Sequence, residues 1–402
     1  MNIDGAILPE DIFFNILSWL PAISVLRFKS VCKSWYSLIR SSSFVDHHRK
    51  CINNYNNPTF IIAGNHPFYV GISRPPTLNL LTIKFQSPPV RLELDSPCLH
   101  EFSNKEIDMF ICNGIVCLHV SVEGHTLCLK THMNVSLWNP ATKQLLDLPQ
   151  SPFPLPTRHH GSLIVSIGFG FDVETNDYKL VRLFTSSDWP EENRVELYSL
   201  KADSWTSLDA VLPQVDYIGH NPKTPYREKT YCWLGRKIIH QPDNIFIVTH
   251  FILTFDFTDE VFGTMSLPDA EAADAVGSLP KLAIVRENIA YFKRVDASYI
   301  EVWMLYEFGV CESWTQLYKV GPLAARQPLE ISENGNFLFF GQGTYDICIY
   351  NVVTGEITNY STQGIFGPQD AQLKVIDYRE SLVLVERGGA TANSLNNAVH
   401  SI

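Results

Sequence analysis

The chain has 402 residues, of which 45% are apolar and 12% aromatic, so it exceeds one minimal module and can build a sizeable core. Its 31 basic and 42 acidic residues give a net charge of −11, which disfavours nucleic acid or an anionic membrane as the general partner. No run of about 18 apolar residues occurs, and the start MNIDGAILPEDIFF lacks a signal-peptide pattern, so we expect a cytoplasmic or nuclear protein.

The first 46 residues carry a helical pattern. In the stretch 8–20, Pro9 can serve as a first helical residue, and apolar residues recur at helical spacing until Pro21 ends the helix. Two further short helices are predicted, one capped by Ser24 and one running through Trp35, before a break of three serines. We therefore expect a small domain of three helices over residues 1–46.

Such a domain has more apolar side chains than it can bury, since below about 40 residues a lone core is usually insufficient. Its surplus apolar surface therefore needs a partner. That partner is either another protein or the remainder of the same chain. A DNA-binding helix-turn-helix is a third interpretation, but the basic excess in this region is slight and spread over both later helices.

After an Asn-rich linker at 47–57, the pattern changes to short β-branched and aromatic segments bounded by turn residues. An aromatic strand followed by a polar turn and a second strand recurs, with steps of 60, 57, 48 and 47 residues between Trp138, Tyr198, Phe255, Trp303 and Tyr350. Steps near 50 residues match the four-stranded blade of a propeller. Residues 58–390 are therefore predicted to form an all-β propeller of six or seven blades, followed by a disordered tail at 391–402.

One alternative fold for this body and one consequence of a closed ring can be stated from the sequence. A pair of β-sandwiches with coincidental hairpins would also explain the strand pattern. If the body is a closed ring, a strand within 58–72 should pair with strands near 370–386, because closure eliminates exposed sheet edges.

Several motifs resemble known families. The helical region resembles an F-box, through Leu8-Pro9-Glu-Asp, the segment Val31-Cys-Lys-Ser-Trp35 and the Ser-Ser-Ser-Phe44 tail. The body resembles the plant-type F-box-associated, kelch-like domain in a series of motifs: Cys112-Asn-Gly-Ile-Val-Cys117, Trp138-Asn-Pro-Ala-Thr142, Gly168-Phe-Gly-Phe-Asp172, Asn176-Asp-Tyr-Lys179, Val195-Glu-Leu-Tyr-Ser-Leu200, Asp203-Ser-Trp205, Phe255-Asp-Phe-Thr-Asp-Glu260, Glu312-Ser-Trp314 and Leu329-Glu-Ile-Ser-Glu-Asn-Gly335. Together these motifs span nearly the whole chain in one order.

The resemblance implies the substrate-recognition subunit of an SCF-type cullin-RING ubiquitin ligase, which has no catalytic residue and no cofactor of its own. The helical domain would dock on a Skp-type adaptor, and the propeller would recruit a protein for ubiquitination and degradation. The implied docking residues are Leu8, Pro9, Ile12, Ile16, Leu17, Leu20, Leu26, Val31 and Trp35. Some of these must instead hold the helices together, and the sequence alone does not divide the two groups.

Two alternatives stay open. A stand-alone propeller could act as an enzyme or as a carbohydrate-binding module. Within the family, the chain could be a self-incompatibility receptor whose targets are basic ribonucleases.

One cluster of residues invites a metal-site interpretation. Six potential soft ligands lie within 21 residues, namely Cys112, Cys117, His119, His125, Cys128 and His132. Their spacing is not that of a zinc motif, and cysteine in an apolar strand commonly packs as a small hydrophobe. We therefore predict no metal site.

Charge is the sequence's main guide to the substrate surface. One predicted loop holds Asp188, Glu191 and Glu192 beside Trp189, and a second acidic region follows Phe251. Propellers present ligands to loops at one face of the ring. These loops are either solvated turns or a negative rim that steers a basic partner.

Overall fold

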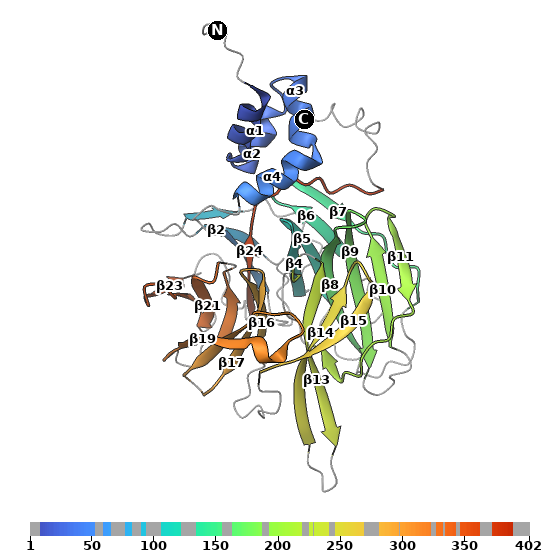
Figure 1. The fold of residues 1–402 in the computed structure, drawn as a ribbon, viewed down its shortest axis with the longest axis vertical. Helices are drawn as coiled ribbons and strands as arrows, with labels where there is room; N and C mark the ends of the chain where they lie inside the picture. Colours follow the sequence, from blue (N-terminus) through green and yellow to red (C-terminus); the bar gives the residue numbers. More distant parts are fainter. Residues whose placement is uncertain are drawn as a thin grey trace, which may run out of the picture.

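The computed structural model describes residues 9–52, 59–65, 77–82, 90–93, 106–121, 134–154, 163–186, 193–218, 225–227, 229–240, 246–268, 281–296, 298–322, 327–332, 334–342, 346–361 and 372–388. Over these residues the chain has two parts: a helical head (residues 9–52) and a body of four-stranded antiparallel sheets (residues 59–388). Figure 1 shows the head seated on one side of the body.

The head contains four helices in the described part of the chain: α1 (Glu10–Ser18), α2 (Ala22–Phe28), α3 (Lys33–Arg40) and α4 (Ser42–Ile52). The three predicted helices correspond to α1, α2 and α3, and the structure adds a fourth, α4. The serines that suggest a break instead begin α4, because the Ser41 hydroxyl accepts a hydrogen bond from the Phe44 amide at 3.3 Å. The predicted linker at 47–57 accordingly begins inside a helix. None of the described helices is long and apolar enough to cross a membrane.

Five sheets of the body are each built from four consecutive strands. The first contains β4 (Glu106–Cys112), β5 (Ile115–Ser121), β6 (Val135–Asn139) and β7 (Gln144–Asp147). The second contains β8 (Leu163–Asp172), β9 (Asp177–Ser186), β10 (Arg194–Ser199) and β11 (Ser204–Leu208), and the third contains β12 (Tyr217–Ile218), β13 (Thr230–His240), β14 (Phe246–Asp256) and β15 (Val261–Ser266). The fourth contains β16 (Lys281–Val285), β17 (Asn288–Arg294), β18 (Ile300–Leu305) and β19 (Trp314–Val320), with a short 3-10 turn, η4 (Cys311–Ser313), before β19, and the fifth contains β20 (Gln327–Ile331), β21 (Phe337–Gln342), β22 (Asp346–Asn351) and β23 (Ile357–Ser361).

These five sheets explain the repeat in the sequence. The five equivalent aromatic residues, Trp138, Tyr198, Phe255, Trp303 and Tyr350, lie on β6, β10, β14, β18 and β22, which are the third strands of their sheets. The repeat therefore marks successive blades of one kind. Five blades of the described chain are thus each built from four consecutive strands, and the composite sheet described next is the sixth sheet of the ring.

A further sheet is assembled from both ends of the body. In it β24 (Gln372–Tyr378) pairs with β1 (Thr59–Asn65), which is followed by β2 (Thr77–Thr82) and β3 (Val90–Glu93). The β1–β24 register runs from Thr59 opposite Tyr378 to Asn65 opposite Gln372. This confirms the predicted pairing of the first body strand with a strand near the end of the chain. The composite sheet has no repeat signal because its strands come from opposite ends of the sequence.

The sheets follow one another around a closed ring. Contacts join β4 to β8, β8 to β13, β13 to β16, β16 to β20, β20 to β24 and β24 back to β4. This arrangement is a β-propeller, in which each blade packs its two faces against its neighbours. The alternative of two sandwich domains is therefore wrong.

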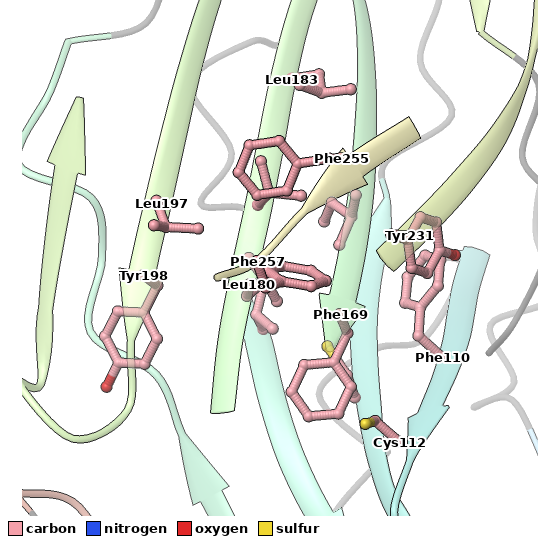
Figure 2. Packing of buried hydrophobic residues seen from close by; sticks show 14 of the residues in the cluster. Phe110, Cys112, Phe169, Leu180, Leu183, Leu197, Tyr198, Tyr231, Phe255 and Phe257 are labelled. Carbon is pink, nitrogen blue, oxygen red and sulfur yellow. The ribbon is translucent and has the colours of Figure 1, made fainter. Parts of the chain in front are cut away.

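The largest apolar cluster fills the space between the blades that begin with β4, β8 and β12 (Figure 2). Phe110, Phe169 and Tyr231 contribute side chains to it from three different blades. Gly168 allows this approach, because a Cβ atom there would lie 2.7 Å from the Trp233 ring and 2.9 Å from the Tyr231 ring. The glycine-aromatic motif at 168–172 is thus a packing motif of the ring.

Charged residues join the turns of neighbouring blades. Lys179 Nζ lies 3.0 Å from Asp172 in its own blade and 2.9 Å from Glu260 in the next blade. Thr258 also donates a hydrogen bond to Asp172 at 3.1 Å. Burial favours the neutral form of Asp172, but hydrogen bonds from Thr175 and Lys179 hold the pKa of its carboxyl at about 2. The pair therefore stays ionised and links the two blades.

Candidate functional site

The head has its own apolar core. Five of its residues are fully buried in one cluster: Leu17, Ala22, Val25, Ile39 and Phe44. Another group packs against this cluster while remaining partly exposed, and it includes Leu20, Leu26 and Trp35. His48 fixes α4 to the end of α1, because its Nε2 atom lies 2.9 Å from the Leu20 carbonyl oxygen. Burial lowers the pKa of His48, so its imidazole is neutral at pH 7.

Outside this core, several large apolar side chains of the head are exposed. Ile12 and Ile16 on α1 are 41% and 51% exposed, Ile23 on α2 is 49% exposed, and Val31 is 59% exposed. Trp19 and Tyr36 are also exposed. We call these six residues the apolar head surface. Soluble proteins seldom expose so many large apolar side chains in one small unit unless a partner covers them.

The structure distributes the nine predicted docking residues over different environments. Leu8 lies outside the described residues. Pro9, Ile12, Ile16 and Val31 are exposed, whereas Leu17 is fully buried in the head core. The other three, namely Leu20, Leu26 and Trp35, are partly buried against that core.

Sequence reasoning missed three members of the apolar head surface: Trp19, Ile23 and Tyr36. The spacing of Ile12, Ile16 and Trp19, at i, i+4 and i+7, would have placed Trp19 on the same face of α1. Ile23 and Tyr36 lie on other helices, and no spacing rule within one helix could have joined them to α1.

The body has two sides that differ in their relation to the head. The β4–β5 turn meets the head where the Arg49 guanidinium donates a hydrogen bond to Asn113, and Ala141 of the β6–β7 turn packs on the head core. We call this the near side. Successive turns of an antiparallel sheet alternate between its two ends, so the other connections leave from the opposite, far side.

The predicted substrate residues belong to one of those other connections. Asp188, Trp189, Glu191 and Glu192 lie outside the described residues, between the end of β9 at Ser186 and the start of β10 at Arg194. Both of these strand ends belong to the far side, opposite the turn that joins β8 to β9.

A long hairpin also extends toward the far side. β13 and β14 pair over eleven residues each, from Thr230 opposite Asp256 to His240 opposite Phe246. Their neighbours are shorter: β12 reaches only to Arg236 on β13, and β15 only to Phe251 on β14. Figure 1 shows this hairpin projecting away from the helices. Its length was not predicted from the sequence.

The two described cysteines of the cluster of possible metal ligands pack as hydrophobes. Cys112 and Cys117 are fully buried in the largest apolar cluster, and burial raises the pKa of the Cys117 thiol far above its usual range. Within the described ranges no group of three or more His, Cys, Asp or Glu side chains could hold a metal ion. Of the remaining residues of that cluster, His119 is described, whereas His125, Cys128 and His132 lie outside the described residues.

Comparisons with known proteins agree with this two-part architecture. Residues 6–47 match the F-box domain, and residues 74–385 match the F-box associated beta propeller domain. The F-box protein CPR1 of Arabidopsis thaliana is 23% identical over 328 residues, covering 78% of this chain and 73% of that protein. An F-box/kelch-repeat protein of the same plant is 24% identical over 386 residues, covering 91% of this chain and 93% of that protein.

The match to the propeller domain covers more than half of the chain, and the structure has the sheet ring that this domain requires. The match to the F-box covers the four-helix head almost completely. The chain therefore belongs to the plant F-box proteins that carry a C-terminal F-box associated β-propeller domain.

Proposed function

We propose that the chain is the substrate-recognition subunit of an SCF-type ubiquitin ligase, acting in the cytoplasm or the nucleus. The head binds a Skp-type adaptor, and the propeller recruits the protein to be ubiquitinated and degraded. The observation that carries this proposal is the apolar head surface, which stays exposed although the rest of the head is closed on its own core. A helical partner that covers Ile12, Ile16 and Ile23 would remove that surface from water.

The chain itself supplies no step of ubiquitin transfer in this proposal. Among the described cysteines, Cys117 and Cys232 are fully buried, and burial raises the pKa of each thiol, so neither forms a nucleophilic thiolate at pH 7. Transfer falls to the charged conjugating enzyme that the cullin-RING complex brings. The role of this chain is to hold two proteins at once.

The far side of the ring is the proposed target-binding side. The head occupies part of the near side, so a target bound on the far side meets no competition from the adaptor. The described ends of β9 and β10 belong to this side, and the acidic residues that lie between them in the sequence favour a basic target. A self-incompatibility receptor whose targets are basic ribonucleases is one example of a receptor with such a basic target.

Adaptor dependence tests the proposed function as a whole. The full chain should co-purify with a Skp-type adaptor and accelerate ubiquitin transfer to a captured target. A chain that begins at Pro58 keeps the body but lacks the head, so it should capture the same target without binding the adaptor or promoting transfer. If the headless chain still binds the adaptor, the proposal is wrong. A stand-alone enzyme or carbohydrate-binding module predicts activity that does not depend on the adaptor.

Charge neutralisation tests the proposed basic target. Changing Asp188, Glu191 and Glu192 to Asn or Gln should slow association of the captured target and flatten its salt dependence, because the steering field is weaker. Dissociation and adaptor binding should change less. Stopped-flow association at low and physiological ionic strength measures the effect. Equal association rates at both salt concentrations would exclude steering by these residues.

A further inference from the structure

The chain does not end at the ring-closing strand β24. Residues 379–388 continue along the near side of the body, and we call this segment the C-terminal strap. Figure 1 shows its red trace passing from β24 between α4 and the blade that contains β6 and β7. Ser381, Leu382 and Val385 are buried, so the strap is packed into the molecule over much of its length.

Leu382 and Glu380 of the strap contact the head. Leu382 is 3% exposed and belongs to the same apolar cluster as Leu17, Val25 and Phe44. One Glu380 carboxylate oxygen accepts a hydrogen bond from the Ala22 amide at 2.7 Å, at the start of α2. The head core is therefore completed by a residue more than 300 positions away in the sequence.

The body holds the same strap from the other side. Asn139, which is fully buried, donates hydrogen bonds from Nδ2 to the carbonyl oxygens of Ser381 at 3.0 Å and Val383 at 2.7 Å. Its Oδ1 atom accepts a hydrogen bond from the Ala141 amide at 2.9 Å, which orients the side chain. Asn139 thus uses its donors for the strap and its acceptor for its own turn.

Further contacts extend this attachment over two blades. Gln144 Oε1 accepts a hydrogen bond from the Val385 amide at 3.2 Å. The Gly388 amide donates to the Leu200 carbonyl oxygen, also at 3.2 Å, and so reaches the next blade. The strap therefore joins the head to two blades beyond the one that it leaves.

The β4–β5 turn is shaped to let the strap pass. Gly114 has a φ of +75°, and a Cβ atom there would lie 2.5 Å from Ser381 Cβ and 2.6 Å from the Arg379 carbonyl oxygen. Only glycine fits both this backbone conformation and this close approach. The motifs at 112–117 and 138–142 thus each contain a residue that contacts the strap, namely Gly114 and Asn139.

We propose that the C-terminal strap is a positioning device that locks the head and the propeller into one rigid body. Without it, the head would be held by the connection through 53–58 and by the contacts of Arg49 and Ala141. A swinging head would spread a bound target over a larger volume and lower the effective concentration of its lysines near the ubiquitin donor. The role of the strap in positioning a target's lysines rests on the proposed function, whereas the rigid attachment of the head to the propeller does not.

Two native cysteines allow a direct test of the rigidity. Cys32 in the head and Cys311 in the body are exposed, and the other described cysteines are buried. With Cys98 and Cys128 replaced by Ser, spin labels on these two thiols report the distance between the two parts. We expect one narrow distance distribution for the parent chain, with a width at least doubled by Glu380→Ala with Leu382→Ala.

A second variant approaches the strap from the body. Asn139→Asp keeps the acceptor for its own turn but loses the donor for the strap, and it should broaden the distribution in the same way. Two controls should stay narrow: Glu380→Gln, which still accepts a hydrogen bond, and Val211→Ala, at an exposed position of the body. A broad distribution in the parent chain, or narrow distributions in both strap variants, would overturn the proposal.

Self-ubiquitination of the assembled ligase adds a functional readout that separates the two proposals. Peptide mapping should find a restricted set of modified lysines on the parent chain and a wider set on both strap variants, at unchanged adaptor affinity. An unchanged lysine set in variants with broadened distances would refute the positioning role. If the parent chain fails to bind the adaptor, the proposed function is wrong, and the distance measurement still decides whether the strap confers rigidity.

Discussion

Replacing Ile16 and Ile23 by Glu should reduce affinity for a Skp-type adaptor by about a hundredfold or more. Covering a half-exposed large apolar side chain contributes roughly half of the 1.5 to 3 kcal/mol of full burial, and burying a carboxylate in its place adds a desolvation cost of several kcal/mol. The combined loss therefore exceeds about 2.8 kcal/mol, and each tenfold in affinity corresponds to about 1.4 kcal/mol. Both side chains are about half exposed in the free chain. The melting temperature should therefore change little. Isothermal titration calorimetry with purified adaptor and differential scanning calorimetry measure the two quantities.

Two control substitutions make this prediction specific. Val211 in the body is 90% exposed, and Val211→Glu should leave adaptor affinity unchanged. Leu17 is buried in the head core, so Leu17→Ala should lower the stability of the head by about 2 to 5 kcal/mol. Unchanged adaptor affinity in the Ile16 and Ile23 double variant would show that the adaptor binds elsewhere.

Removal of β1 should abolish cooperative folding of the propeller. A chain that begins at Thr77 lacks β1, so β24 loses its only neighbour in the composite sheet and the ring opens. Loss of β1 would also expose Ile376 and Phe339, the ring partner of the deleted Phe60, and both side chains are fully buried in the closed ring. We expect an insoluble product, or one without a sharp thermal transition, because open sheet edges pair with other chains.

The matched control for this experiment is the chain that begins at Pro58. It also lacks the head, but it keeps β1 and therefore the β1–β24 pairing. It should melt in one sharp transition by circular dichroism. A sharp transition at the same temperature from the chain that begins at Thr77 would show that ring closure contributes nothing to the stability of the body.

Much of this architecture could be predicted because its signals are local. Apolar spacing and Pro9 mark α1, since helix periodicity and an N-terminal proline act within a few residues. The predicted cap of the second helix is wrong, because α2 begins at Ala22, directly after Pro21, and Ser24 lies inside it. The aromatic residues at equivalent positions mark third strands of successive blades, since each blade is one contiguous unit that repeats the same contacts. Ring closure followed from a general argument about sheet edges, and the structure confirms it.

The division of the head residues could not be predicted. Leu17 and Ile16 are neighbours in one apolar stretch, yet the first is buried and the second is half exposed. The difference depends on which side of α1 meets α4 and the strap, which is a matter of packing between elements distant in sequence. A helical pattern identifies an apolar face but not its partner.

The amino-acid sequence by itself determined that this protein has a helical head and a propeller of repeated strands, because each helix, strand and turn depends on residues close to one another. Only the tertiary structure decided how the two parts are joined. Leu382 enters the head core and Asn139 holds the strap backbone, although neither residue belongs to the head. Such contacts unite segments hundreds of residues apart, and their geometry exists only once the ring has closed.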